Sequence, residues 1–101
     1  VISIDKDKND LYVFWAGHPT ANHIYYRRYN ALAGEWEDVV DLIDESAEQL
    51  TRNYLLTCTY QVHDRKIGLV YMTKKASPYN VKFALLSIRK PTQLTLTITP
   101  M

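Results

Sequence analysis

Apolar and polar residues alternate along most of the chain, and two stretches do so in the same order. Residues 11–15 and, after a loop, residues 24–26 recur as residues 67–71 and, after a second loop, residues 81–83. The first pair of segments is offset by 67 − 11 = 56 residues and the second by 81 − 24 = 57, which requires one inserted residue near Pro78. A fixed period of tens of residues is typical of repeat architectures, in which one unit cannot bury its own hydrophobic face. The pattern therefore predicts two copies of one β-unit.

The same alternation predicts eight short strands. Residues 10–16 are apolar on both faces, because Tyr12 and Phe14 point one way and Val13 and Trp15 the other. A strand that is buried on both sides has this pattern. Residues 41–52 are rich in Glu, Ala, Gln and Leu and compete as a short helix; we interpret them as the connection between the two units, with a helical turn. The eight predicted strands cover residues 1–5, 10–16, 23–30, 35–43, 54–63, 66–73, 79–88 and 93–99.

The fold class that follows is all-β. Each unit is a four-stranded antiparallel meander of about 50 residues, and two such units joined end to end are typical of β-propeller blades. We therefore predict a single propeller segment over residues 1–101, with one blade repeat in residues 1–45 and a second in residues 54–101. A sandwich of eight strands is the alternative, but a sandwich does not need two equivalent halves. Two blades cannot close a propeller, so we expect completion by oligomerisation or by a longer parent chain.

Composition narrows the class of protein. Of the 101 residues, 47% are hydrophobic and 23% are charged, which is the mix of an ordered globular domain. The net charge of +1 is too small for a nucleic-acid-binding surface, so we expect no nucleic-acid partner. No apolar run approaches the roughly 20 residues that span a bilayer, so we expect no membrane span. The lone cysteine, Cys58, excludes an intrachain disulfide and is expected to be a small buried hydrophobic residue.

No arrangement of residues along the chain predicts catalysis. The serines lack a nucleophile-elbow motif with a paired histidine and aspartate, and Cys58 has no evident activating base, so no catalytic residue is assigned. Asp5, Asp7 and Asn9 have the alternating spacing of a calcium loop, but Asp10 stands where such a loop needs glycine. We interpret this segment as a polar hairpin turn, and we expect neither a metal nor a cofactor.

Three segments resemble blades of the sialidase-like β-propeller superfamily. They are residues 7–15 (Asp-x-Asn-Asp-Leu-Tyr-Val-Phe-Trp), residues 24–27 (Ile-Tyr-Tyr-Arg) and residues 34–36 (Gly-Glu-Trp). Compared with the Asp-box of that family, residues 29–36 keep Trp36, displace the glycine by one position and lack the serine, aspartate and threonine. The resemblance implies six blades from three chains, eight blades from four, or a longer propeller. It also favours an extracellular location.

A propeller of this kind is expected to bind ligands at the loops that rim its central channel. In each predicted unit this is the loop between the second and third strands, and binding residues commonly lie on loops that a rigid scaffold holds. The polar residues of these loops suit sugar hydroxyls or peptide groups. Trp15, at the end of its strand, is a candidate for stacking on a sugar ring, with core packing as the alternative. The predicted ligand-binding residues are His18, Thr20, Asn22, Lys74, Lys75, Ser77, Tyr79 and Trp15.

We therefore predict a non-catalytic β-propeller module for binding or assembly, with carbohydrate as one candidate ligand. One alternative is a fragment of a sialidase-like glycoside hydrolase, which would need arginines that grip a carboxylate and a tyrosine assisted by a glutamate. Arg27 and Arg28 are adjacent in a predicted strand, so they point to opposite faces and cannot grip one anion together. The other alternative is a purely structural scaffold. The expected partners are further copies of the chain, or the remaining blades of a parent chain, and a glycan or protein ligand.

Overall fold

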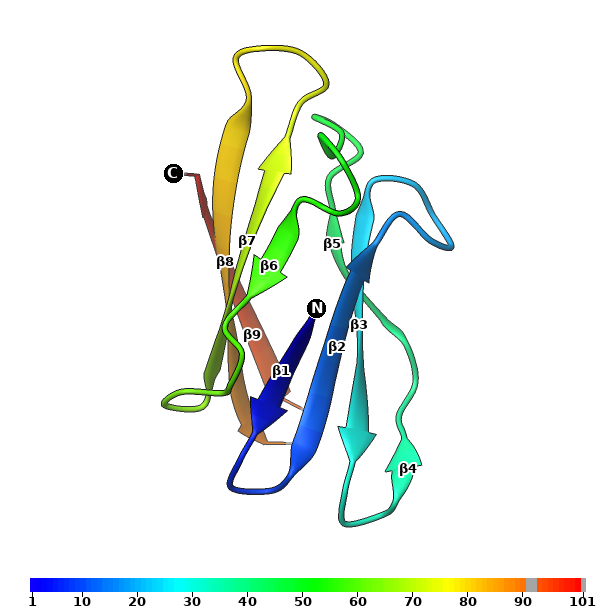
Figure 1. Cartoon of the computed structure of the whole chain (residues 1–101), viewed down its shortest axis with the longest axis vertical. Coiled ribbons are helices and arrows are strands. Elements are labelled where there is room, and N and C mark those ends of the chain that lie inside the picture. Colours follow the sequence, from blue (N-terminus) through cyan, green and yellow to red (C-terminus); the bar gives the residue numbers. More distant parts are fainter. Residues whose placement is uncertain (91–92, 101) are drawn as a thin grey trace.

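The computed structural model describes the backbone of residues 1–90 and 93–100 and the side chains of residues 1–88 and 95–100. In this part of the chain all regular structure is β-strand, and no helix is present. Two antiparallel sheets stand side by side, and their strands run roughly along the long axis of the molecule (Figure 1). The predicted all-β class is confirmed.

Each sheet is a meander in which consecutive strands pair. In the first sheet the order is β1-β2-β3, and β4 and β5 both pair with β3. In the second sheet the order is β6-β7-β8-β9. Because β4 and β5 occupy successive parts of one edge, both sheets have four strand positions. The bounds are β1 Ile2–Asp5, β2 Asp10–Ala16, β3 His23–Asn30, β4 Glu35–Trp36, β5 Val40–Asp44, β6 Leu56–Cys58, β7 Lys66–Thr73, β8 Asn80–Lys90 and β9 Gln93–Pro100.

The strand expected over residues 35–43 is divided into β4 and β5. Between them, the carbonyl of Glu37 accepts a hydrogen bond from Nε of Arg27 at 2.7 Å, and the Glu37 carboxylate accepts one from Nη1 of Arg28 at 3.0 Å. The N–H of Glu37 still donates to the carbonyl of Arg28 at 2.8 Å, but its own carbonyl is taken by the Arg27 side chain. The regular pairing with β3 then stops after Glu37 and resumes at Val40. The prediction of one continuous strand over residues 35–43 is therefore wrong at residues 37–39.

The strand expected over residues 54–63 is shortened to β6. Beyond Cys58 the chain turns to the first sheet, where the N–H of Ile4 donates to the carbonyl of Tyr60 at 2.9 Å and the N–H of Val62 donates to the carbonyl of Ile4 at 2.8 Å. Residues 41–52 contain no helix, because β5 takes the first part of this segment. A single turn follows, in which the N–H of Gln49 donates to the carbonyl of Glu45 at 2.7 Å. The other predicted strands agree with the structure to within two residues.

The two sheets pair their strands in equivalent registers. Leu11 of β2 lies opposite Tyr29 of β3, and Ile67 of β7 lies opposite Leu86 of β8. The offsets are 67 − 11 = 56 and 86 − 29 = 57, which are the offsets of the sequence repeat. A residue of the first sheet and its equivalent in the second sheet therefore occupy the same place on the ladder.

The hydrophobic core lies between the two sheets. Side chains alternate between the faces of a strand, so each sheet has an inner face toward its neighbour and an outer face away from it. One continuous cluster joins the inner faces and excludes water from the space between them. Its buried members are Tyr12, Phe14, Ile24, Tyr26, Ile43 and Leu50 from the first sheet and the segment after it, and Ile67, Leu69, Tyr71, Ala84, Leu86 and Ile88 from the second sheet.

The inner face of the first sheet and the inner face of the second sheet are formed by different positions of the repeating unit. Phe14 and Tyr26 lie on the inner face of the first sheet, and their equivalents, Val70 (14 + 56) and Phe83 (26 + 57), lie on the outer face of the second sheet. The contact between the sheets therefore joins two different faces of the repeating unit.

The positions that form the inner face of the second sheet form the outer face of the first sheet. Leu69 and Tyr71 are buried on the inner face of the second sheet, and their equivalents, Val13 (69 − 56) and Trp15 (71 − 56), lie on the outer face of the first sheet. The sheets thus pack head to tail. One face of each kind is buried between the sheets, and one face of each kind remains on the outside of the molecule. This arrangement is the heterologous type of contact, which can continue from unit to unit.

Candidate functional site

The two loops predicted to bind ligands lie at the same end of the molecule, at the top of Figure 1. The segment that joins the sheets runs between these loops and is hydrogen-bonded to both. The N–H of Leu50 donates to Oδ1 of Asn22 at 3.0 Å, and the N–H of Lys74 donates to the carbonyl of Gln49 at 2.8 Å. Asn22 and Lys74 therefore hold the joining segment. Lys74 makes this bond through its backbone, so its side chain remains a predicted ligand-binding group. The other predicted loop residues, His18, Thr20, Lys75, Ser77 and Tyr79, are exposed and also remain predicted ligand-binding residues.

Trp15 lies on the outer face of the first sheet and is half-buried. Its indole Nε1 donates to the carbonyl of His18 at 2.7 Å, and its ring stacks on Tyr25 with centroids 5.9 Å apart. Trp15 is therefore absent from the core between the sheets and forms a rigid part of an open surface.

A groove of about 270 Å³ lies beside this tryptophan on the same face. Trp36, which is 44% exposed, forms part of its wall, and the guanidinium of Arg27 stands 5.8 Å from the centre of the Trp36 ring. The Trp36 and Tyr29 rings form an edge-to-face pair with their centroids 5.2 Å apart. A cation over an aromatic face and an edge-to-face ring pair both fix side chains in place. The lining residues are Val13, Trp15, Arg27, Trp36 and Val39.

The outer face of the second sheet is also apolar. Val70 and Phe83 lie opposite each other on β7 and β8 and are half-buried. The Phe83 ring covers Gly68, where an added Cβ would meet the ring at 3.0 Å. This close approach places the end of the aromatic ring over Gly68, in the middle of the sheet. The outer face therefore has an aromatic centre, and Thr97 and Thr99 of β9 are exposed beside it.

Polar contacts join the inner faces near the upper end. The Tyr71 hydroxyl donates to Oε2 of Glu45 at 2.5 Å, and Nζ of Lys82 lies 2.9 Å from Oε1 of the same carboxylate. Burial, followed by the hydrogen bond to Glu45, raises the pKa of Tyr71. Tyr71 is 1% exposed and keeps its proton, and the Glu45 carboxylate forms an ion pair with Lys82. The contact is thus a buried ion pair with a supporting phenol, which stabilises the packing of one sheet on the other.

Glu48 makes a second contact of this kind. Its Oε1 accepts hydrogen bonds from Oγ1 of Thr73 at 2.6 Å and from Nδ2 of Asn80 at 3.0 Å. These two bonds, with the nearby charge of Lys82, lower the pKa of Glu48 to about 2. Hydrogen bonds to the charged form of a carboxylate favour that form.

Acid is expected to weaken the contact at Glu48. The folded-state pKa of about 2 is below the ordinary value of 4.5, so the stabilisation is complete above pH 4.5 and is lost as the pH falls toward 2. The urea midpoint of the wild-type chain should fall over this range more steeply than that of Glu48→Gln, which keeps an acceptor but carries no charge. Parallel pH profiles of the two proteins would contradict this assignment.

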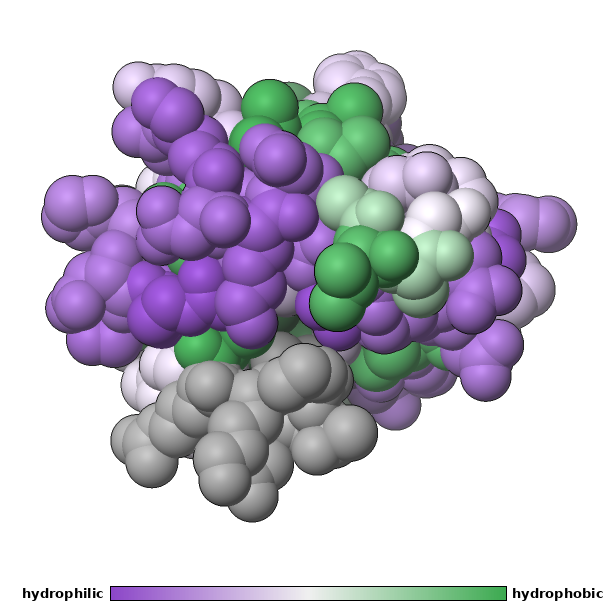
Figure 2. Space-filling view, turned by 90° about the horizontal axis from the view of Figure 1, so that it is seen from below, coloured by the Kyte–Doolittle hydropathy of each residue, from purple (hydrophilic) through white to green (hydrophobic). Residues whose placement is uncertain are grey.

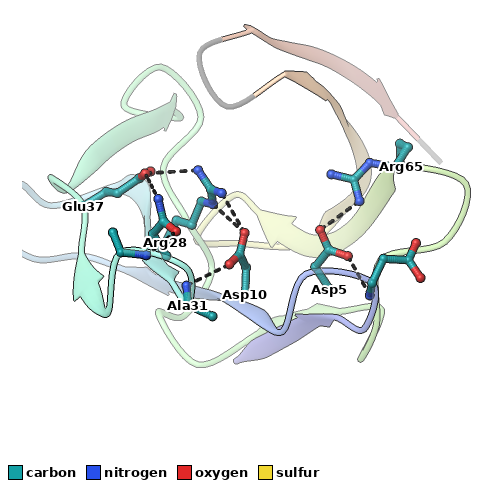
Figure 3. Close-up of polar contacts among 9 residues, drawn as sticks. Asp5, Asp10, Arg28, Ala31, Glu37 and Arg65 are labelled. Atoms are coloured by element: carbon teal, nitrogen blue, oxygen red, sulfur yellow. Dashed lines mark hydrogen bonds and ion pairs between the residues drawn. The ribbon is translucent and has the colours of Figure 1, made fainter.

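Buried charges also occupy the lower end of the space between the sheets (Figure 3). Arg28 donates from Nη2 to Oδ2 of Asp10 at 2.6 Å and from Nη1 to Oε2 of Glu37 at 3.0 Å. Arg65, from the turn before β7, donates to Oδ2 of Asp5 at 2.8 Å and so joins the second sheet to the first. Asp5 and Asp10 face each other across β1 and β2 and are 1% and 2% exposed. Each carboxylate is neutralised by its own arginine.

Two further features at this end are the raised pKa of Tyr12 and the turn that contains Asp5 and Asp7. Burial, partly opposed by the charge of Arg28, raises the pKa of Tyr12 to about 12, so this tyrosine stays neutral. Oδ1 of Asp5 accepts from the N–H of Asp7 at 3.2 Å, as expected of a polar turn. Among the residues that the structure describes, no three His, Cys, Asp or Glu side chains converge as metal ligands do.

The surface at this end is largely hydrophilic. Figure 2 views it from below and shows smaller hydrophobic areas between the hydrophilic ones. A hollow of about 360 Å³ next to Arg28 and Asp10 is also lined by Lys8, Asn30 and Leu32. Both charges at its base are already paired with each other, so the hollow offers no free buried ion to a ligand.

Sequence reasoning missed the groove and the contacts of Glu45 and Glu48. The groove joins residues of β2 and β3 to Trp36, the last residue of β4, and to Val39, which lies in the break between β4 and β5. The shared outward phase of Val13, Trp15 and Arg27 was a usable signal, because alternate residues of paired strands share a face. No local pattern marks the two glutamates, since their partners are 25 to 37 residues away.

Comparison of the chain with protein-family models, with curated proteins and with solved structures finds no match. Over the residues that the structure describes, no helix has the length and apolar character needed to cross a bilayer.

Proposed function

We propose that the chain is a non-catalytic module for assembly and binding, built as two blades of a sialidase-like β-propeller. Further copies of the chain, or further blades of a longer chain, would complete the ring. One observation carries the proposal: the two sheets pack through unlike faces of the repeat, and the two faces that stay open are the same two kinds. A contact of this type can repeat from unit to unit, and it forms a ring where the rotation between units closes.

The open faces argue for a covered surface in the complete assembly. In repeat proteins, a terminal unit that ends the array carries a polar outer face. Here the outer face of the first sheet carries the half-exposed Trp36 beside Trp15, and the outer face of the second carries Val70 and Phe83. Neither outer face therefore has the polar surface of a terminal unit. Large apolar surfaces with polar surroundings are characteristic of interaction sites.

The ligand-binding part of the proposal rests on the two long loops. They lie at one end of the molecule, and the segment between the sheets ties them together through Asn22 and Lys74. This support holds the exposed His18, Lys75 and Tyr79 on a rigid base, as ligand-binding loops require. Carbohydrate is the ligand class we propose, and a glycan array probed with the assembled protein tests it.

The hydrolase alternative has less support from the structure. A tyrosine nucleophile needs access to its substrate and a base that takes up its proton. Tyr71 lies next to Glu45, but Tyr71 is buried between the sheets, and its raised pKa holds the proton on the phenol. Arg27 and Arg28 lie on the outer and inner faces respectively, so they do not converge on one anion.

Light scattering of the purified chain tests the proposed assembly. The mass of one chain is 11.8 kDa, and we expect a stable multiple of it, three or four copies. A chain that is folded, as judged by a cooperative urea transition, yet remains a single copy at high concentration would contradict assembly from this chain alone. Far-ultraviolet circular dichroism at the same concentration shows that the measured species contains the β-sheets.

A further inference from the structure

We infer that the outer face of the second sheet docks into the groove on the first sheet of the next copy, with Phe83 as the side chain that enters. This inference rests on the proposed function and gives the contact between copies at the level of residues. The groove is the one lined by Val13, Trp15, Arg27, Trp36 and Val39.

The contact inside the chain serves as a template. There, Phe14 and Tyr26 of the first sheet pack together at 5.7 Å and share one buried cluster with Leu69 and Tyr71 of the second. In the repeat, Tyr26 corresponds to Phe83 (83 − 57 = 26). Phe83 of one copy therefore has the same position relative to the next copy as Tyr26 has inside the chain.

The receiving side follows from the same template. Leu69 and Tyr71 correspond to Val13 and Trp15, which line the groove. The groove of about 270 Å³ exceeds the cavity of about 150 Å³ that holds a benzene ring in a protein core. Its walls are aromatic or aliphatic, apart from Arg27, and a guanidinium beside a phenylalanine ring is favourable.

Charge favours this head-to-tail contact over a symmetric one. The outward residues in the middle of β7 and β8 are uncharged: Gly68, Val70, Met72, Val81, Phe83 and Leu85. When these residues dock on the groove, Arg27 is the one charged residue of the groove lining that becomes buried. Its Nε already donates to the carbonyl of Glu37. Two grooves that faced each other would bring Arg27 of one copy near Arg27 of the other, and like charges in contact disfavour a complex.

Two blocking variants and their mixture test the inference. Val39→Arg adds a cation beside Arg27 in the groove, at a position that is 48% exposed, and Phe83→Arg does the same to the opposite face. Each variant alone is expected to be a monomer in light scattering. An equimolar mixture is expected to form a 1:1 pair of two 11.8 kDa chains and nothing larger, because one free groove then meets one free Phe83 face.

The controls separate this inference from the proposed function. Leu32→Arg, at a residue that is 99% exposed and outside both faces, should keep the mass of the wild type. Near-ultraviolet circular dichroism must show native packing in every variant. If the wild type assembles but Phe83→Arg does not change its mass, or if the mixture fails to pair, the docking is overturned and the proposed assembly stands. If the folded wild type is itself a monomer, the docking and the assembly of this chain with further copies of itself are both overturned.

Discussion

Replacing Phe14 with alanine is expected to remove about 3–5 kcal/mol from the free energy of unfolding. The ring is fully buried in the middle of the core and packs against Tyr26 at 5.7 Å. Its truncation would leave a cavity between two sheets that cannot close around it, because other side chains hold them apart. A domain of this size has a total stability of about 5–15 kcal/mol, so the loss is a large part of it. Urea denaturation at a fixed protein concentration measures the change.

Leu32→Ala is the matched control for Phe14→Ala. Leu32 is almost completely exposed on the turn between β3 and β4, so its truncation should change the urea midpoint little. A loss below about 1 kcal/mol for Phe14→Ala would mean that the two inner faces do not form one close-packed core. The fixed concentration matters because self-association adds stability by mass action.

Replacing Asp10 with alanine is expected to cost a similar amount, about 3–5 kcal/mol. Asp10 accepts from Nε and Nη2 of Arg28 and from the backbone N–H of Ala31. Burial lowers the pKa of the Arg28 guanidinium, but the hydrogen bond and charge of Asp10 offset this and raise it overall. Without Asp10, a buried cation would keep only the half-exposed Glu37 as its partner. The free energy of unfolding in urea measures this cost.

Two further variants test whether the loss comes from the unpaired charge. The double variant Asp10→Leu with Arg28→Met removes both ions, and it should recover most of the lost stability, since a buried pair and an apolar pair of similar size are often equivalent. Glu37→Ala removes only the outer partner and should cost no more than about 1 kcal/mol. A double variant as unstable as Asp10→Ala alone would show that shape, not charge, is what Asp10 provides.

Much of the fold could be predicted from the sequence because its signals are local. The alternation in β2, β3 and β7 reports the two faces of a strand directly, and these three strands have the predicted bounds. The break after Glu37 could not be predicted, since the Glu37 carbonyl there accepts from the side chain of Arg27 on the neighbouring strand. The early end of β6 depends on the backbone of Ile4, which is more than 50 residues away.

The site was harder to predict than the fold, for the same reason. The loops that carry His18 and Tyr79 were recognised by their place between strands, and they do lie at one end of the molecule. Predicting the groove required knowledge of where the edge strand breaks, because Val39, which lines the groove together with Val13, lies in that break. Composition and period contain no information on such contacts between segments.

The polar contacts between the sheets also determine which half of the chain can pack against which. Glu45 of the first half is neutralised by Lys82, whose equivalent in the first half is Tyr25 (82 − 57). A chain made by joining the first half to a second copy of itself would therefore place an aromatic ring where the carboxylate needs a cation.

The same holds at the lower end. Asp5 is neutralised by Arg65, whose equivalent is Asn9 (65 − 56), so the duplicated chain would also leave this buried carboxylate without a charge partner. At these two contacts between the sheets, the first half supplies the acid and the second half supplies the base. Any larger array of these halves must alternate between them, and a gene in which their order is shuffled to place two first halves in sequence should yield a chain that fails to fold.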